Sequence, residues 1–228
     1  MMMKFIAKPF VLGTLAALAI ANVPAANAAD ISTLYSTGVG DNGAAVSGTG
    51  FADAHWTLEG GTAYVNFTGM GYPAGDWVSD TSASRWIGST PDAGTTVSDN
   101  VGQTFTYSTT FSLTGLDAST ASFAGMFAAD DGVNELLLNG KLIPISAGTY
   151  NSWTDFSYAG PLFVSGENTL SFVTNNNGGG AAGLNVDFTS ATAAVPEPAT
   201  WAMMLVGFGM IGMTVRSRRR RNVQVTYA

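Results

Sequence analysis

The chain has 228 residues, no cysteine and a formal net charge of −7. Its basic residues gather at the two ends, so residues 29–195 contain 15 acidic residues and only two basic ones, Arg85 and Lys141, for a net charge of −13. A region this acidic does not bind nucleic acid or anionic lipid by electrostatics. The absence of cysteine excludes disulfides, thiolate metal sites and thiol catalysis, and it is compatible with an exported domain.

The N-terminal end has the pattern of a secretory signal peptide. Lys4 and Lys8 precede an apolar run over residues 10–20, and a stretch of small residues follows. Within that stretch Ala26-Asn27-Ala28 fits an A-x-A cleavage site. We expect residues 1–28 to be removed by signal peptidase, with cleavage after Ala28.

Residues 29–190 are predicted to form one all-β domain. Apolar and polar residues alternate over 105–113, 170–172 and 184–188, which is typical of strands with one buried face. Asn139-Gly140 between apolar runs predicts a β-hairpin. Further strands are expected at 63–67 and 162–164, and no amphipathic helix is evident. Many short strands separated by Gly and Asn turns indicate a β-sandwich or barrel.

The order of these segments resembles the galactose-binding-domain-like jelly rolls. In this fold a strand that ends in Leu-Asn-Gly, here residues 138–140, packs beside a late strand of the Asn-Thr-Leu-x-Phe kind, here residues 168–172. The resemblance runs from about residue 56 to residue 188 and implies a jelly-roll β-sandwich. Many members of this fold bind carbohydrate and many others are structural appendages, so the fold alone does not choose a function.

Aromatic residues in polar segments are the candidates for carbohydrate binding. Sugar recognition uses exposed aromatic rings next to polar groups that fix the orientation of the sugar. Trp77 and Trp153 lie beside or near an aspartate and are expected at the surface, whereas Trp86 is expected to be buried. The full candidate set is Trp77, Tyr150, Trp153 and Asn176, with Tyr72 in a similar segment. The alternative, that these rings anchor loops and the core, stays open.

Asn176 belongs to the run of residues 175–177, which is followed by three glycines and predicts a loop at the rim of the sandwich. A loop of this kind either bonds sugar hydroxyls or connects two strands without binding anything.

A cluster of oxygen-bearing side chains precedes the predicted hairpin. Asp130, Asp131, Asn134 and Glu135 are residue types that suit Ca²⁺, although their spacing does not match an EF-hand loop. A polar turn that opens a strand explains them equally well, so a structural calcium ion stays open and no other cofactor is expected.

Catalysis has little support in the sequence. His55 is the only histidine, at the expected start of a strand, and no Gly-x-Ser-x-Gly segment occurs. Fifteen scattered acidic residues do not define a catalytic pair. The sequence therefore predicts a protein that is not an enzyme.

The C-terminal end combines a linker at residues 191–198, an uncharged span at 199–215 and a basic tail at 216–228. A 17-residue span covers about 26 Å as a helix, near the short limit for one membrane crossing. The basic residues are expected to stay cytoplasmic by the positive-inside rule. They are Arg216, Arg218, Arg219, Arg220 and Arg221.

This tail resembles the PEP-CTERM sorting signal of Gram-negative bacteria in its P-E-P-x-x-W-A variant. Five residues match that pattern: Pro196, Glu197, Pro198, Trp201 and Ala202. The resemblance implies recognition by an exosortase in the inner membrane, cleavage near Pro-Glu-Pro, and association with an exopolysaccharide or biofilm matrix. Some family collections also label this segment as an ice-binding-protein C-terminal motif.

The sequence therefore predicts an exported, non-enzymatic cell-surface or exopolysaccharide-matrix protein that is transiently anchored in the membrane and binds carbohydrate. Two alternatives stay open, a secreted glycan-active enzyme and an ice-binding adhesion protein.

Overall fold

The structure, a computed structural model, describes residues 27–66, 76–91, 102–178, 180–196 and 198–220. Its residues divide into two compact units, one formed by Ala26–Pro198 and the other by the terminal segments that include the C-terminal helix. Residues 1–26, nearly all of the predicted signal peptide, lie outside the described residues.

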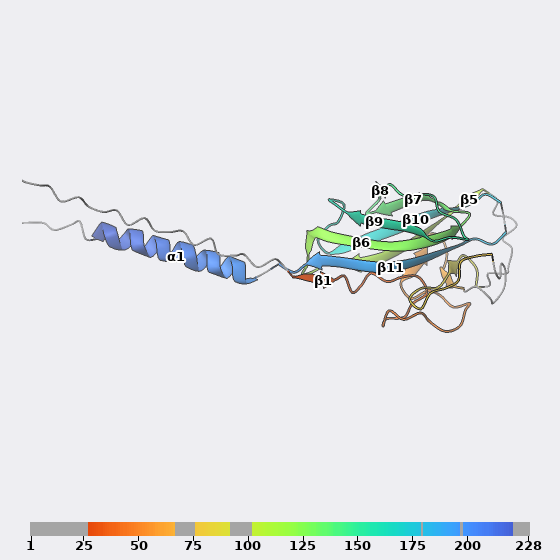
Figure 1. Cartoon of the computed structure of the whole chain (residues 1–228), viewed down its shortest axis with the longest axis horizontal. Coiled ribbons are helices and arrows are strands. Elements are labelled where there is room, and N and C mark those ends of the chain that lie inside the picture. The colour runs from red at the N-terminus through yellow and green to blue at the C-terminus, as the bar shows by residue number, and fades with distance from the viewer. Residues whose placement is uncertain (1–26, 67–75, 92–101, 179, 197, 221–228) are drawn as a thin grey trace, which may run out of the picture. The chain divides into compact units, whose positions relative to one another are not determined.

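The Ala26–Pro198 unit is a sandwich of two antiparallel sheets (Figure 1). In the first sheet the strand order is β3-β4-β11-β6-β9, with β1 also paired to β11, and in the second it is β2-β5-β10-β7-β8. Strands β5, β6, β7 and then β9, β10, β11 alternate between the two sheets, which confirms the predicted jelly-roll β-sandwich. The first sheet contains β1 (Ala28–Asp30), β3 (Tyr64–Val65), β4 (Ile87–Gly88), β6 (Asp117–Asp130), β9 (Thr154–Ala159) and β11 (Gly183–Ala194). The second contains β2 (Trp56–Leu58), β5 (Gln103–Ser112), β7 (Val133–Leu138), β8 (Lys141–Ile143) and β10 (Glu167–Asn176).

Aromatic side chains from both sheets fill the space between them. Phe127 on β6 and Phe156 on β9 both meet Phe172 on β10, with ring centroids 5.6 and 5.5 Å apart in edge-to-face contacts. The alternation predicted for β5 is confirmed, since Tyr107 and Phe111 are buried. Each large apolar side chain buried in this way contributes about 1.5–3 kcal/mol.

The predicted hairpin at Asn139-Gly140 is confirmed as the turn between β7 and β8. Both residues have positive φ angles, 53° and 72°, as a two-residue hairpin turn requires. The Asn139 side chain also ties the turn to its surroundings. It accepts a hydrogen bond from the Thr169 N–H at 2.9 Å and donates one to the Leu162 carbonyl at 2.9 Å.

The predicted strands differ from the structure in two places. The strand predicted at 162–164 is wrong, because this segment is a loop that turns Phe163 into the core. The longest strand, β6, was not predicted, because its Ala, Ser and Gly residues hide the alternation. Gly125 in β6 allows close packing of the strands, since a Cβ atom there would overlap the carbonyl oxygen of Asp187 on β11.

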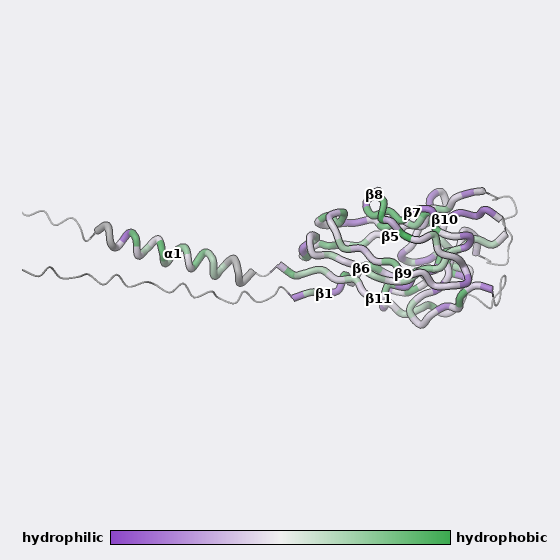
Figure 2. Tube along the Cα trace, turned by 45° about the horizontal axis from the view of Figure 1, so that its top comes forward, coloured by the Kyte–Doolittle hydropathy of each residue, from purple (hydrophilic) through white to green (hydrophobic). Residues whose placement is uncertain are grey.

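The C-terminal helix α1 spans Pro198–Arg220. Proline suits its first position, where no intrahelical N–H bond is lost. Figure 2 shows hydrophobic residues over much of its length, and its side chains are described from residue 202 to residue 217. Among the described residues, no helix is long and apolar enough to cross a membrane.

Candidate functional site

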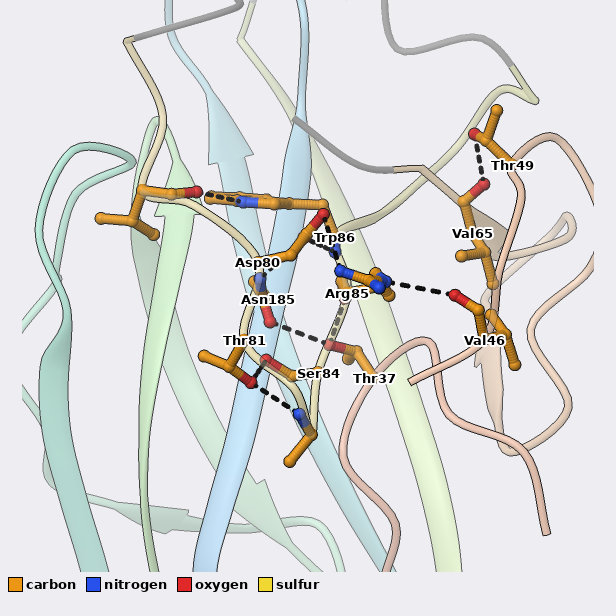
Figure 3. Close-up of polar contacts among 12 residues, drawn as sticks. Thr37, Val46, Thr49, Val65, Asp80, Thr81, Ser84, Arg85, Trp86 and Asn185 are labelled. Carbon is orange, nitrogen blue, oxygen red and sulfur yellow. Dashed lines mark hydrogen bonds and ion pairs between the residues drawn. The ribbon is translucent and has the colours of Figure 1, made fainter. Parts of the chain in front are cut away.

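A partly buried polar network holds the segment of residues 76–91 against other parts of the sandwich unit (Figure 3). The Asp80 carboxylate accepts a hydrogen bond from the Trp86 N–H at 3.1 Å and pairs with the Arg85 guanidinium at 3.5 Å. Arg85 Nε also donates to the Val46 carbonyl at 3.2 Å, and Thr37 Oγ1 donates to the Arg85 carbonyl at 2.6 Å. One of the two basic residues of the acidic region therefore joins three loop segments.

Trp77 lies within this anchored segment and is buried, so the prediction that it lies at the surface is wrong. Its ring packs on Trp86 with the centroids 4.1 Å apart, and its Nε1 donates to Asp130 Oδ2 at 3.1 Å. Only 6% of Trp77 is exposed. The polar neighbours of Trp77 indicated a loop, but this loop folds back and buries both rings against Ala128 of β6. The predicted burial of Trp86 is confirmed.

Trp153 and Tyr150 lie at the margin of the same aromatic cluster. Both rings are half-buried and pack against the buried tryptophans, which leaves part of each ring accessible. The Tyr150 carbonyl accepts a hydrogen bond from the Val78 N–H at 2.8 Å, so the two loops support one another. The role of Trp153 and Tyr150 in carbohydrate binding stays a prediction, and Tyr72 lies outside the described residues.

Asn176 does not lie in an exposed loop, which corrects the expectation for it. It is the last residue of β10, where it pairs with Gln103 of β5, and it is fully buried. Asn175 is also buried, and its side chain donates to Asn134 Oδ1 at 2.9 Å. The strand extends further than the Asn-Gly composition indicated, because β10 stays paired with β5 through both residues. Asn176 therefore cannot contact a sugar at the rim.

The carboxyl groups of Asp130 and Asp131 are close to each other but have different partners. Burial raises the pKa of Asp130 to about 7, helped by a hydrogen bond with Asp131 and by the charge of Asp131, while the Trp77 N–H acts in the opposite direction. Asp131 Oδ2 instead accepts from the Gly178 N–H at 2.9 Å. The environment of Asp130 thus keeps its carboxyl protonated to a higher pH than is usual for an aspartate.

The structure brings the carboxyls of Asp130 and Asp131 together, but the described residues do not assemble the four proposed calcium ligands into one site. Asp130 faces Trp77, Asp131 faces Gly178, and Asn134 is bonded to Asn175. Within the described ranges, no three or more His, Asp or Glu side chains are placed together so that they could hold a metal ion, Glu135 included. These four residues are explained by contacts within the protein and by solvent exposure.

An open groove of about 730 Å³ lies beside the edge strand β9. Its walls come from β6, β9, β11 and the connection that follows β8, and they include Ser146, Asp155, Ser157 and Thr189. On β9, Asp155 and Ser157 are exposed and Phe156 between them is buried. By the same alternation Trp153 precedes them on the exposed face. The half-buried Trp153, which directly precedes β9 and does not line the groove, therefore shares a face with the Asp155 carboxylate and the Ser157 hydroxyl.

Sequence reasoning missed this groove because four separate segments form it. Strand β9 was not among the predicted strands. Two contacts of Ala124 help to form the groove: it pairs with Ser157, and its carbonyl accepts a hydrogen bond from Thr189 Oγ1 at 3.2 Å. Both contacts depend on the fold. A usable signal was nevertheless present in the alternation of Trp153, Asp155 and Ser157.

His55 has a packing role at the start of β2. Its ring stacks on Tyr35 with the centroids 3.7 Å apart, and its backbone N–H donates to Asp53 at 2.8 Å. Burial raises the pKa of Asp53, although its carboxylate also accepts hydrogen bonds from the Gly38 and Trp56 N–H groups. This carboxylate joins the backbone of Gly38 to that of residues 55–56.

The residues of the tail motif are described in part. Pro196 is exposed, Pro198 begins α1, and Ala202 and Arg216 are exposed on that helix. Glu197 and Arg221 lie outside the described residues. So do the side chains of Pro198, Trp201, Arg218, Arg219 and Arg220.

Comparison with known protein families matches residues 194–221 to the PEP-CTERM protein-sorting motif. The chain therefore carries this motif, as its resemblance predicted. The motif implies an exported protein that is transiently anchored in the membrane by a C-terminal helix and processed by an exosortase.

No curated protein matches the chain. Among solved structures, the chain is similar to one described as a family 35 carbohydrate binding module from an environmental isolate. The two chains are 14% identical, and the match covers 64% of this chain and 98% of that chain with a TM-score of 0.28. The assignment of the sandwich fold rests on the strand topology described above.

Proposed function

We propose that this is a non-enzymatic protein of the cell surface or exopolysaccharide matrix, and that its β-sandwich binds polysaccharide in the groove beside β9. The sorting motif at residues 194–221 supports delivery out of the cytoplasm. The observation that carries the binding proposal is the exposure of Asp155 and Ser157 in the lining of the groove, with the half-buried Trp153 just before β9.

The chemistry of this surface suits a sugar chain. The accessible part of the Trp153 ring offers an apolar face for the C–H groups of a pyranose ring. The Asp155 carboxylate and the hydroxyls of Ser146 and Ser157 can bond sugar hydroxyls, which fixes the orientation of the ligand. An open groove suits a continuous chain better than it suits a small molecule that must be enclosed.

The charge of the domain selects among polysaccharides. Residues 29–195 carry a net charge of −13, and Asp155 adds a negative charge in the groove itself. Long-range repulsion disfavours uronic acid polymers and sulfated polymers at low ionic strength. We therefore expect a neutral or cationic polysaccharide as the ligand.

Affinity electrophoresis of the purified protein in gels that contain the producer's neutral exopolysaccharide tests this proposal. Retardation of the wild type is expected, and Trp153→Ala should weaken it about tenfold, the typical effect of losing one aromatic contact. Val164→Ala is the matched control, because it removes an apolar side chain that is 47% accessible and lies neither in the groove lining nor beside β9.

The possible results separate the proposal from its alternatives. Equal retardation of wild type and Trp153→Ala, or no retardation of either, contradicts binding at this groove. Release of sugar fragments by the wild type contradicts the non-enzymatic part of the proposal and supports a glycan-active enzyme, with Asp155→Asn as the variant that then tests the carboxylate.

A further inference from the structure

The first and last strands of the sandwich unit pair with each other next to both predicted processing sites. Strand β1 pairs with the end of β11, with Ala28 opposite Ala194. Beyond this ladder the Val195 N–H donates a hydrogen bond to the Asn27 carbonyl at 2.9 Å. Pro196 of the sorting motif follows directly. Asn27, a residue of the predicted signal peptide, therefore accepts a hydrogen bond from Val195, which immediately precedes Pro196-Glu197-Pro198.

Removal of the signal peptide abolishes this contact. Signal peptidase adds water across the Ala28–Ala29 amide bond, which leaves a carboxylate on Ala28 and an amino group on Ala29. Asn27 and Ala28 depart with the leaving peptide, so the ladder of β1 and β11 then begins at Ala29. The Ala194 N–H keeps its separate partner, Thr120 Oγ1 at 2.8 Å. The main chain that becomes free thus begins at Val195.

Main-chain hydrogen bonding explains why this matters for the second cleavage. An enzyme that binds an extended peptide does so largely through main-chain N–H and C=O groups, as in strand addition. A donor that is already paired within a sheet is not available for such binding. In the uncleaved precursor the Val195 N–H, one residue before Pro196, is already bonded to Asn27.

We infer that removal of the signal peptide precedes and permits cleavage at the sorting motif, because Asn27 holds the main chain of Val195 in the uncleaved precursor. This inference rests on the sorting in the proposed function and on the cleavage that the sequence predicts at both ends. The second reaction breaks one amide bond near Pro196-Glu197-Pro198 and passes the acyl group to water or to an amine. Its substrate is the chain from which residues 1–28 have been removed.

Four forms of the full-length chain, expressed in the producing organism, test the order of the reactions by mass spectrometry of both termini. Ala28→Leu blocks the first cleavage, because signal peptidase requires a small residue there, and the Ala28 side chain is exposed in β1. We expect Ala28→Leu to reduce the C-terminally cleaved fraction about tenfold, the effect of one main-chain hydrogen bond.

The remaining two forms combine Ala28→Leu with a substitution at Val195. Val195→Pro removes the N–H donor, so it should restore C-terminal cleavage even though the signal peptide is retained. Val195→Ala is the matched control, because it shortens the same side chain but keeps the N–H group, and it should leave the precursor uncut. Val195 is 39% exposed, so neither substitution removes core packing.

The possible outcomes are distinguishable. C-terminal cleavage of Ala28→Leu at the wild-type level overturns the inference. Failure of Val195→Pro to restore cleavage, or equal restoration by Val195→Ala, also overturns it, since the retained signal peptide then acts by some means other than this hydrogen bond. A wild-type protein that keeps its C-terminal segment overturns the proposed processing together with the inference.

Discussion

The pH dependence of stability should be set in large part by the Asp130 carboxyl. Burial and the neighbouring Asp131 raise the pKa of Asp130 to about 7 in the folded protein, whereas an aspartate in the unfolded chain titrates near 3.9. Between about pH 4 and pH 7 the folded protein therefore holds a proton that the unfolded chain has released. The stability that this proton provides is fully present below about pH 4 and is lost as the pH rises through 7.

The substitution Asp130→Asn removes this titration and keeps the shape of the side chain. The amide oxygen can still accept from Trp77 Nε1, which lies 3.1 Å from the present carboxylate oxygen, and its N–H groups can donate to Asp131. Each tenfold change in the proton affinity of Asp130 corresponds to about 1.4 kcal/mol of stability. Solvent screening at this partly accessible carboxyl reduces the total change in stability. We therefore expect Asp130→Asn to be roughly 1–2 kcal/mol more stable than wild type at pH 8 and nearly equal to it at pH 4.

Urea denaturation of the purified protein at pH 4 and pH 8, followed by tryptophan fluorescence, measures both differences. Glu59→Gln serves as the control, because it removes a carboxylate that is exposed, and it should leave the difference between the two pH values unchanged. If Asp130→Asn loses as much stability as wild type between pH 4 and pH 8, the assigned environment of Asp130 is wrong.

Three further predictions concern packing, the hairpin and sorting. Gly125→Ala should destabilise the sandwich by about 1–3 kcal/mol in denaturation experiments, because the new Cβ overlaps the Asp187 carbonyl oxygen; unchanged stability would mean that β6 and β11 are less closely packed than described. Asn139→Ala should lower the free energy of unfolding by about 2–3 kcal/mol, since the Thr169 N–H loses its acceptor and alanine disfavours the positive φ angle. Asn139→Gly should be less harmful by about 1 kcal/mol, and equal losses would contradict a role for the backbone angle. Glu197→Ala should leave the C-terminal segment on the protein recovered from membranes, and normal removal of that segment by mass spectrometry would count against processing at this motif.

Sequence reasoning succeeded where a local pattern decides the structure. The alternation over β5 and the Asn139-Gly140 turn depend on neighbouring residues, so both were predicted. Strand β6 was missed because its many Ala, Ser and Gly residues hide the alternation. The need for glycine at position 125 comes from Asp187 of β11, which lies 62 positions further along the chain.

The candidate binding site was predictable only in part. Trp153 was selected from its neighbours, but the same reasoning selected Trp77, which the loop of residues 76–91 turns inward onto Trp86. Burial of a loop tryptophan depends on tertiary contacts such as that between Trp77 and Asp130, and these contacts join residues 53 positions apart. The groove beside β9 arises in the same way, from the pairing of β6 with β9.

The intact mass of the protein recovered from the cell surface tests the central claim, that this β-sandwich is exported and sorted through its C-terminal motif. We predict a species that lacks residues 1–28 and everything beyond the Pro196-Glu197-Pro198 region, with or without added mass at its new C-terminus. A surface species that still carries residues 199–228 would contradict sorting by cleavage.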